Sequence, residues 1–185
     1  MYTGCVACVY VLYRAGWHPT QTQTSNLENS MNVDDQLKAF RDVIAFAEGT
    51  DRAEVQKSHH FGYDVIVGGS LFTCFDDHPR KLVYLPRYKI KSSAAGRYQM
   101  IRATWNALRK RLSLPDFSPV SQDRACDELL RECGARNLLA AGDFDKACYR
   151  ANKIWASLPG SPYGQRTEKI DTLRRIFRER GGIIR

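Results

Sequence analysis

One carboxylate in the sequence stands where a predicted helix ends. Apolar residues recur at helical spacing from Leu37 to Ala47, and Glu48 lies directly before Gly49, a residue type that ends helices. The C-terminus of a helix carries partial negative charge, so the pKa of a carboxyl group there is expected to rise. A glutamic acid that keeps its proton near neutral pH can act as a general acid. Most helix-end glutamates are solvated, so Glu48 is a candidate catalytic acid only together with its neighbours.

Two aspartates that follow Glu48 are weaker candidates. Asp51 lies just past the predicted helix end. We favour a loop residue over a catalytic partner for Asp51, because Asp side chains commonly bond the backbone of their own turn. Asp64, beside Tyr63, is better suited to contact a substrate than to catalyse a reaction.

The histidines and cysteines do not form a metal-ligand pattern. His59 and His60 have no third ligand at a suitable spacing, so we expect both in solvent. Cys5 and Cys8 are matched neither by a second pair nor by nearby histidines, which argues against zinc. We expect no metal and no cofactor. We also expect the four later cysteines to be reduced: Cys74, Cys126, Cys133 and Cys148.

A small β lobe is predicted after the first helix. That helix should begin at a cap on Asp34 or Asp35. Two short apolar runs, 63–67 and 71–73, flank Gly68-Gly69-Ser70, a pattern that predicts a β-hairpin.

The rest of the chain is predicted to be helical. Gly96 precedes a second helix that would hold Tyr98 and Gln99 in its first turn, with Trp105 on its apolar face. Three further helices are expected to start near Ser118-Pro119, Gly142-Asp143 and Thr167. The predicted fold is α+β, mostly helical, with a small β-hairpin lobe and a substrate cleft between the lobes. That order of elements is lysozyme-like.

The first thirty residues differ from the rest of the 185-residue chain. An apolar run, Cys5–Tyr13, precedes a Thr-, Gln-, Ser- and Asn-rich stretch. No Lys or Arg precedes Arg14, unlike in a secretory signal, and the run is too short to span a membrane. We expect residues 1–30 to be an extension, disordered or not native, with a weak signal-anchor as the alternative. Residues 31–185, starting at Met31, would form one catalytic domain.

Eight sequence blocks, in order, resemble those of lambda-type phage lysozymes, a family of endolysins. They are Ala-Glu-Gly-Thr-Asp (47–51), Tyr-Asp-Val-Ile-Val-Gly-Gly (63–69), Asp-His-Pro-Arg-Lys-Leu-Val (77–83), Ala-Gly-Arg-Tyr-Gln (95–99), Asp-Phe-Ser-Pro (116–119), Ser-Gln-Asp (121–123), Ile-Trp-Ala-Ser-Leu-Pro-Gly (154–160) and Tyr-Gly-Gln (163–165). The similarity runs from about Lys38 nearly to the C-terminus.

The resemblance implies a lysozyme-like fold and a reaction. The expected reaction cleaves the β-1,4 bond between N-acetylmuramic acid and N-acetylglucosamine in peptidoglycan. In this family of lytic transglycosylases the 6-hydroxyl of the muramic acid replaces water and gives a 1,6-anhydro end. The acid/base role falls on Glu48. One carboxyl group can protonate the leaving oxygen and later accept the hydroxyl proton, so no second carboxylate is needed.

The resemblance also indicates which residues contact the glycan. Gln99 can bond the N-acetyl group of a sugar, and the ring of Tyr98 can pack on a pyranose. Tyr163 is a sugar platform if it faces the groove and a core-edge residue if it does not. Tyr63 and Asp64 complete the expected substrate-binding set.

The family context implies a place of action and a partner. The enzyme would be made in the host cytoplasm and act on the wall in the periplasm after a holin permeabilises the membrane, causing host lysis. Peptidoglycan glycan strands are the expected partner of a monomer that neither inserts stably into membranes nor binds nucleic acid.

Three other readings stay open. A hydrolytic lysozyme of the same fold would add water, and a wall-binding protein would have lost activity. The net charge of +8 and basic clusters such as Arg109-Lys110-Arg111 suit a nucleic-acid-binding protein. The clusters are spread over several predicted elements without a DNA-reading motif, which favours solvated faces.

Overall fold

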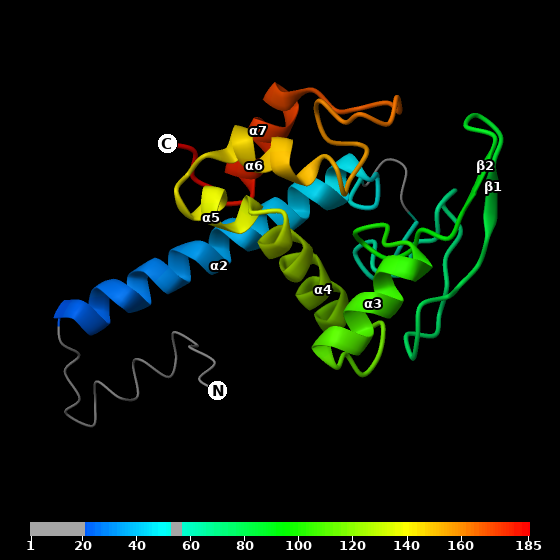
Figure 1. The fold of residues 1–185 in the computed structure, drawn as a ribbon, viewed down its shortest axis with the longest axis horizontal. Helices are drawn as coiled ribbons and strands as arrows, with labels where there is room; N and C mark the ends of the chain where they lie inside the picture. Colours follow the sequence, from blue (N-terminus) through cyan, green and yellow to red (C-terminus); the bar gives the residue numbers. More distant parts are fainter. Residues whose placement is uncertain (1–20, 53–56) are drawn as a thin grey trace.

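A computed structural model of the chain describes residues 21–52 and 57–185 (Figure 1). Within these ranges the fold is mostly helical, with one two-stranded antiparallel sheet. The elements, in chain order, are α2 (Gln21–Ala47), β1 (Val83–Leu85), β2 (Ile90–Ser92), α3 (Arg102–Leu112), α4 (Pro119–Glu132), α5 (Ala135–Ala140), α6 (Phe144–Ala151) and α7 (Ile170–Glu179). The predicted α+β class is confirmed.

The long helix α2 is the axis on which the helical lobe is built. It packs against α5 and α7, and its Phe40 meets the rings of Phe144 and Phe177 at centroid distances of 5.7 and 6.3 Å. All three rings are fully buried. Burying each side chain contributes about 1.5 to 3 kcal/mol, so this cluster fixes α2 firmly within the helical lobe.

Local sequence signals set the start of two helices as predicted. Ser118 caps α4 by accepting a bond from the Ser121 backbone N–H at 3.5 Å, and Pro119 takes the first helical position. Asp143 caps α6 by accepting a bond from the backbone N–H of Lys146 at 3.4 Å.

The predicted start of the first helix is wrong. Helix α2 runs through Asp34 and Asp35 from Gln21, so neither aspartate is its cap. Apolar periodicity marks only the part of the helix that meets the core, and no helix-breaking residue lies between Gln21 and Asp34. The expectation for residues 1–30 falls largely on residues 1–20, which lie outside the described ranges, and stays a prediction.

The β lobe contains two hairpin-like turns, of which one was predicted. Around Gly68-Gly69 the chain reverses, Val65 bridges to Leu71, and Ile66 N–H donates to the Ser70 carbonyl at 2.7 Å. The sheet proper is the second turn, where β1 and β2 pair Tyr84 with Lys91. This hairpin was not predicted, because its basic, proline-containing sequence lacks the alternation of a half-buried strand.

The second helix starts later than its sequence indicates. Ala95 and Met100 exchange backbone hydrogen bonds of 3.0 and 2.9 Å across a tight turn, and α3 begins only at Arg102. Gln99 sits in this turn at φ +48°, so its predicted place in a first helical turn is wrong. The Gly96 N–H donates to the Val65 carbonyl at 2.8 Å, and this pairing with the β lobe overrides the local helical pattern.

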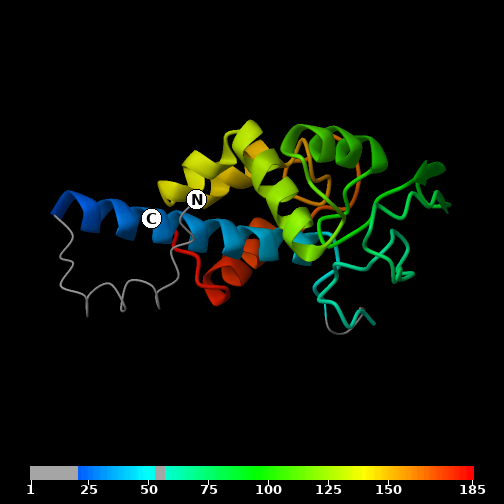
Figure 2. The same cartoon turned by 90° about the horizontal axis from the view of Figure 1, so that it is seen from below.

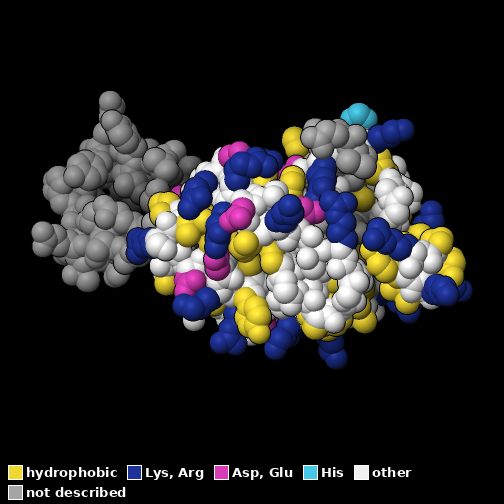
Figure 3. Space-filling model, turned by 90° about the horizontal axis from the view of Figure 1, so that it is seen from above, with side chains coloured by type: hydrophobic (Ala, Val, Ile, Leu, Met, Phe, Trp, Pro, Cys, Tyr) yellow, Lys and Arg dark blue, Asp and Glu magenta, His cyan; other side chains and the backbone are white. Residues whose placement is uncertain are grey.

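The hairpin and the first turns of α2 lie at opposite ends of the described molecule (Figures 1 and 2). Lys and Arg side chains are spread over much of the surface seen in Figure 3. Within the described ranges, no helix has both the length and the apolar character that crossing a bilayer requires.

Candidate active site

Glu48 directly follows Ala47, the last residue of α2. The Gly49 N–H donates to the Phe46 carbonyl at 3.1 Å and the Thr50 N–H donates to the Ala45 carbonyl at 2.9 Å. This pair of bonds is a Schellman motif, which needs a left-handed residue after the C-cap. Gly49 supplies it at φ +77°. The backbone that carries Glu48 is therefore fixed within a single turn.

The carboxyl group of Glu48 is held in a poorly solvated position. Its side chain is partly buried, and its Oε1 accepts a hydrogen bond of 2.6 Å from the hydroxyl of Ser157. Burial raises the pKa of Glu48 from 4.5 to about 7, while the Ser157 bond pulls the pKa in the opposite direction. The raised pKa inferred from the helix end is thus present, with burial as its main cause. Glu48 can exist in both protonation states near neutral pH.

A cleft of about 500 Å³ opens at Glu48. The hairpin contributes Leu85 and Ile90, and the segment after α6 contributes Trp155 and Tyr163. Apolar side chains dominate the lining, and Glu48 is the one carboxylate among the described residues that form it. A partly apolar cleft with aromatic side chains and a few polar groups is suited to binding sugar rings.

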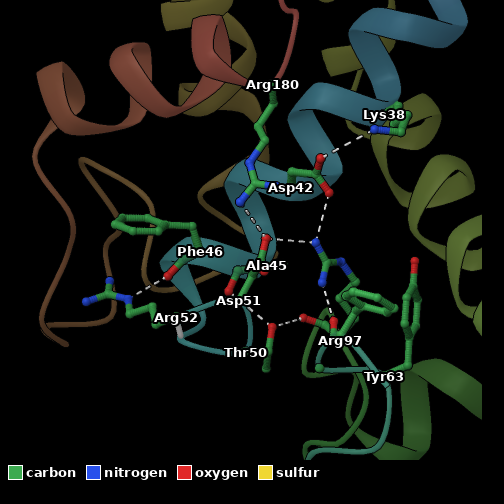
Figure 4. Close-up of polar contacts among 12 residues, drawn as sticks. Lys38, Asp42, Ala45, Phe46, Thr50, Asp51, Arg52, Tyr63, Arg97 and Arg180 are labelled. Carbon is green, nitrogen blue, oxygen red and sulfur yellow. Dashed lines mark hydrogen bonds and ion pairs between the residues drawn. The ribbon is translucent and has the colours of Figure 1, made fainter. Parts of the chain in front are cut away.

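Arg97 pairs with two aspartates that lie before and after Glu48 in the sequence (Figure 4). Its guanidinium is buried and its Nη2 reaches Asp42 at 2.8 Å and Asp51 at 2.9 Å. Asp42 precedes Glu48 on α2 and Asp51 follows it in the next turn. The Arg97 carbonyl also accepts a bond of 2.6 Å from the Thr50 hydroxyl. We call Arg97, Asp42 and Asp51 the arginine clamp.

A second set of contacts positions Ser157. The Ser157 carbonyl accepts a bond of 2.9 Å from the Glu168 N–H, and the Glu168 carboxylate pairs with Arg52 at 2.6 Å. Arg52 lies over the ring of Phe46 at 4.4 Å and donates to the Phe46 carbonyl at 3.0 Å. These bonds connect the segment that carries Ser157 to the end of α2. Ser157 and Glu48 are therefore held in place relative to each other.

Three predicted substrate residues lie in the cleft with Glu48. They are Tyr98, Gln99 and Tyr163. The Gln99 Nε2 donates to the carbonyls of Gly96 at 2.9 Å and Val65 at 3.3 Å, which fixes the orientation of its amide. Tyr163 is 56% exposed, so its ring is open to solvent at the cleft. Tyr98 is only 1% exposed, and its hydroxyl donates to Asp123 at 2.6 Å. The ring is therefore not open to a sugar, and the expectation that it packs on a pyranose is wrong.

The structure does not bring Tyr63 and Asp64 to this cleft. The hydroxyl of Tyr63 donates to Asp123 at 2.7 Å, beside a second hollow of about 340 Å³ around the arginine clamp. Asp64 is buried and accepts a hydrogen bond from the Ser58 hydroxyl. Asp51 also belongs to the clamp, where it pairs with Arg180 at 3.2 Å as well. None of the three carboxyl or hydroxyl groups lines the space around Glu48.

Ser157 and Arg97 are the site residues that sequence reasoning missed. Both lie within blocks that resemble lambda-type lysozymes, which is the one signal that points to them. Nothing in their local sequence indicates a partner 109 residues away for Ser157 or 55 and 46 residues away for Arg97.

The described residues contain no cluster of three or more His, Cys, Asp or Glu side chains that could hold a metal ion. His59 and His60 are exposed as predicted. The four later cysteines are free thiols, as predicted, and Cys126 and Cys148 are buried in the core.

Comparisons with known proteins show the family of the chain. A family model described as Endolysin matches residues 38–184. The endolysin of Escherichia phage lambda is 50% identical over 155 residues, which cover 84% of this chain and 97% of the relative. The endolysin of Escherichia phage P2 is 42% identical over 162 residues, covering 83% and 97%.

Solved structures show the same relationship. Bacteriophage lambda lysozyme in complex with a chitohexasaccharide superposes with a TM-score of 0.78 at 51% identity, covering 82% of this chain and 97% of that one. A second structure of lysozyme from bacteriophage lambda gives a TM-score of 0.75 at 50% identity, with the same coverage. The fold is therefore lysozyme-like, and this chain belongs to the endolysin family.

Proposed function

We propose that the protein is a lytic transglycosylase that cleaves the β-1,4 bond between N-acetylmuramic acid and N-acetylglucosamine in peptidoglycan. The observation that carries the proposal is Glu48. This one carboxyl group has a pKa of about 7 and lies in a cleft where no other described lining residue is acidic. A group that must first give and then take a proton works best when its pKa lies near the working pH.

The reaction needs two proton transfers and no water. Protonated Glu48 gives its proton to the glycosidic oxygen as the bond from that oxygen to C1 of the muramic acid breaks. The 6-hydroxyl of the same sugar then bonds to C1 while its proton passes to the Glu48 carboxylate. The products are a free 4-hydroxyl and a 1,6-anhydro end, and Glu48 returns to its protonated form.

The direction of each step fits the environment of Glu48. Burial favours the neutral acid, which is the form needed for the first transfer. The Ser157 hydroxyl donates to Oε1 and so stabilises the carboxylate that accepts the second proton. Burial and the Ser157 bond act in opposite directions on the pKa of Glu48. The pKa therefore stays near neutral pH, where both the protonated and the ionised carboxyl group are populated.

Gln99 and Tyr163 are the proposed sugar contacts. Because the Gln99 Nε2 is used by two carbonyls, its Oε1 is oriented to accept the N–H of an N-acetyl group. The exposed Tyr163 ring offers a face on which a pyranose can pack. The lambda lysozyme relative was solved with a chitohexasaccharide, a polymer of N-acetylglucosamine, which supports a glycan-binding cleft in this fold.

The wider role follows from the family. We propose synthesis in the host cytoplasm, dependence on a holin for access to the periplasm, and action as a monomer. Host lysis would follow from loss of wall strength.

Digestion of purified peptidoglycan tests the proposal. The wild-type chain should release fragments lighter by one water than hydrolysis products, and Glu48→Gln should slow their release by about 10² to 10⁴-fold, the usual contribution of a general acid or base. Asp51→Asn is the matched carboxylate control and should leave the product mass unchanged. Fragments with reducing ends would contradict transglycosylation, and full activity of Glu48→Gln would contradict the role of Glu48.

A further inference from the structure

The β1–β2 hairpin has an inner and an outer face. Leu85 pairs with Ile90, and both line the cleft. Since side chains alternate along a strand, Tyr84 and its partner Lys91 point away from the cleft. Leu82, two residues before Tyr84, shares this outer direction. The outer face is therefore separate from the glycan cleft, although it belongs to the same hairpin.

The outer face exposes large apolar side chains. Leu82 is 57% exposed, Tyr84 is 55% exposed, and Tyr88 in the connecting turn is 36% exposed. The guanidinium of Arg87 lies over the Tyr88 ring at 5.7 Å. Neighbouring exposed apolar groups with cations among them are more typical of an interaction surface than of a surface that meets only water. In Figure 3 the hairpin end, at the right, shows hydrophobic and basic side chains together.

The hairpin also carries positive charge that its surroundings do not neutralise. No Asp or Glu occurs between Asp77 and Asp116 in the sequence. Arg80 and Arg109, which flank the hairpin, are both paired with Asp77. The four cations of the hairpin are exposed and form no ion pair with any described residue: Lys81, Arg87, Lys89 and Lys91.

We propose that this outer face binds the surface of an anionic phospholipid bilayer. The four cations would meet lipid phosphates, while Leu82, Tyr84 and Tyr88 would enter the headgroup region. Tyrosine and leucine beside basic residues are typical of proteins that lie on an anionic membrane. The hairpin projects from the body of the molecule (Figures 1 and 2), and a projecting edge suits an extended surface better than a single polymer chain, which needs a groove.

Binding of this kind is peripheral and extends beyond cleavage of the wall. The inner face of the hairpin stays with the cleft, so a membrane-bound molecule would hold the edge of its cleft close to the bilayer. The enzyme would then be concentrated beside the layer of peptidoglycan that lies nearest to the membrane.

Co-sedimentation of the full chain with lipid vesicles tests the proposal. One set of vesicles contains phosphatidylethanolamine and phosphatidylglycerol, and the other contains phosphatidylcholine alone. The charge variant replaces the hairpin cations by Gln at Lys81, Arg87, Lys89 and Lys91. The apolar variant places Thr at Leu82, Tyr84 and Tyr88. A matched control loses the same charge through Gln at four exposed sites outside the hairpin: Arg136, Arg150, Lys169 and Arg178. Every variant keeps the apolar run Cys5–Tyr13, and urea unfolding verifies that each one folds.

Wild type should bind the anionic vesicles and not the phosphatidylcholine vesicles. The charge variant should bind at least about tenfold more weakly, because each Lys or Arg near an anionic surface adds to affinity. The apolar variant should also weaken several-fold at unchanged charge, and the matched control should change far less. The proposal is overturned if wild type does not bind the anionic vesicles, or if vesicle binding by the matched control weakens as much as binding by the charge variant. It is equally overturned if the apolar variant binds the anionic vesicles as tightly as wild type does, because binding by charge alone would describe a surface for any polyanion.

Discussion

At the scale of single residues, the chemistry depends on how Glu48 exchanges its proton. Burial raises its pKa to about 7, and one hydrogen bond from Ser157 limits the rise. The general acid must be protonated, so activity should fall as the pH rises through this pKa. The pH profile therefore reports directly on the environment of Glu48.

Ser157→Ala should move the alkaline side of the pH profile. The hydroxyl bonds the carboxylate, so its removal raises the pKa of Glu48 and shifts the loss of activity upward by about one pH unit, the value of a charge-assisted bond of about 1.5 kcal/mol. Ser157→Thr keeps a hydroxyl and should leave the profile in place. Steady-state rates on purified peptidoglycan against pH make the comparison. A uniform drop in rate at every pH, without a shift, would mean that Ser157 is only structural.

Glu48 should also cost stability at neutral pH. Its folded pKa of about 7 exceeds the unfolded value of 4.5, so the folded state holds its proton more tightly. Between these two values the free energy of unfolding falls as the pH rises. Two and a half pKa units correspond to as much as about 3 kcal/mol.

Glu48→Gln has no carboxyl group to ionise, so the fall in the free energy of unfolding with rising pH disappears. The variant should therefore be more stable than wild type at pH 8 but not at pH 4. The variant keeps a carbonyl that can accept the Ser157 bond, so the hydrogen bond is controlled. Urea unfolding of both proteins at the two pH values measures the difference. An equal effect of the substitution at both pH values would contradict a raised pKa for Glu48.

At the scale of elements, the end of α2 is held by the arginine clamp. The side chain of Arg97 is 6% exposed and pairs with both Asp42 and Asp51. Removing one member of a buried pair leaves an uncompensated charge and is more costly than removing an exposed pair. Here two carboxylates would be left facing each other.

Arg97→Met should lower the free energy of unfolding by about 3 to 5 kcal/mol. Adding Asp42→Asn to Arg97→Met should recover part of the lost stability, because it removes one of the two carboxylates that have lost their guanidinium partner. Lys38→Met is the control, since the Lys38 side chain is 66% exposed and its Nζ lies 3.7 Å from Asp42, a long ion pair with one solvated partner that contributes less than about 1 kcal/mol. Urea unfolding gives all four values. Equal losses for Arg97→Met and Lys38→Met would refute the clamp.

The elements also show which features a sequence can specify. The caps Ser118 and Asp143 were predicted because a cap bonds a backbone group only three residues away. The turn that holds Gln99 was mistaken for helix because its shape depends on a bond from Gly96 to Val65, far off in the sequence. Glu48 could be found because its helix end is local. Ser157 could not, because its contact with Glu48 forms only when the segment after α6 packs against the end of α2, 109 residues away in the sequence.

At the scale of the whole molecule, the lysozyme-like body is built from residues after the start of α2. From Val33 on, where the structure describes the side chains of α2, the first buried ones are Gln36 and Leu37, and the first turns of α2 extend past the other helices in Figure 1. The family model likewise matches from residue 38. The expectation that residues 31–185 form the catalytic domain stays a prediction.

A chain that starts at Met31 should therefore fold and cleave peptidoglycan like the full chain. Its melting temperature and its rate on purified wall should be unchanged, since no buried side chain described in the fold is lost. Calorimetry and wall digestion of the two forms side by side measure this. A large loss of either quantity would assign residues 1–30 to the working enzyme.

The most direct test of the central claim is digestion of purified peptidoglycan in water labelled with heavy oxygen. If the 6-hydroxyl of the muramic acid captures the cleaved centre, mass spectrometry will find 1,6-anhydro ends that carry no label, and Glu48→Gln will yield almost none of them. If water is the acceptor, every new reducing end will carry one heavy oxygen. That result would contradict transglycosylation and identify the enzyme as a hydrolase.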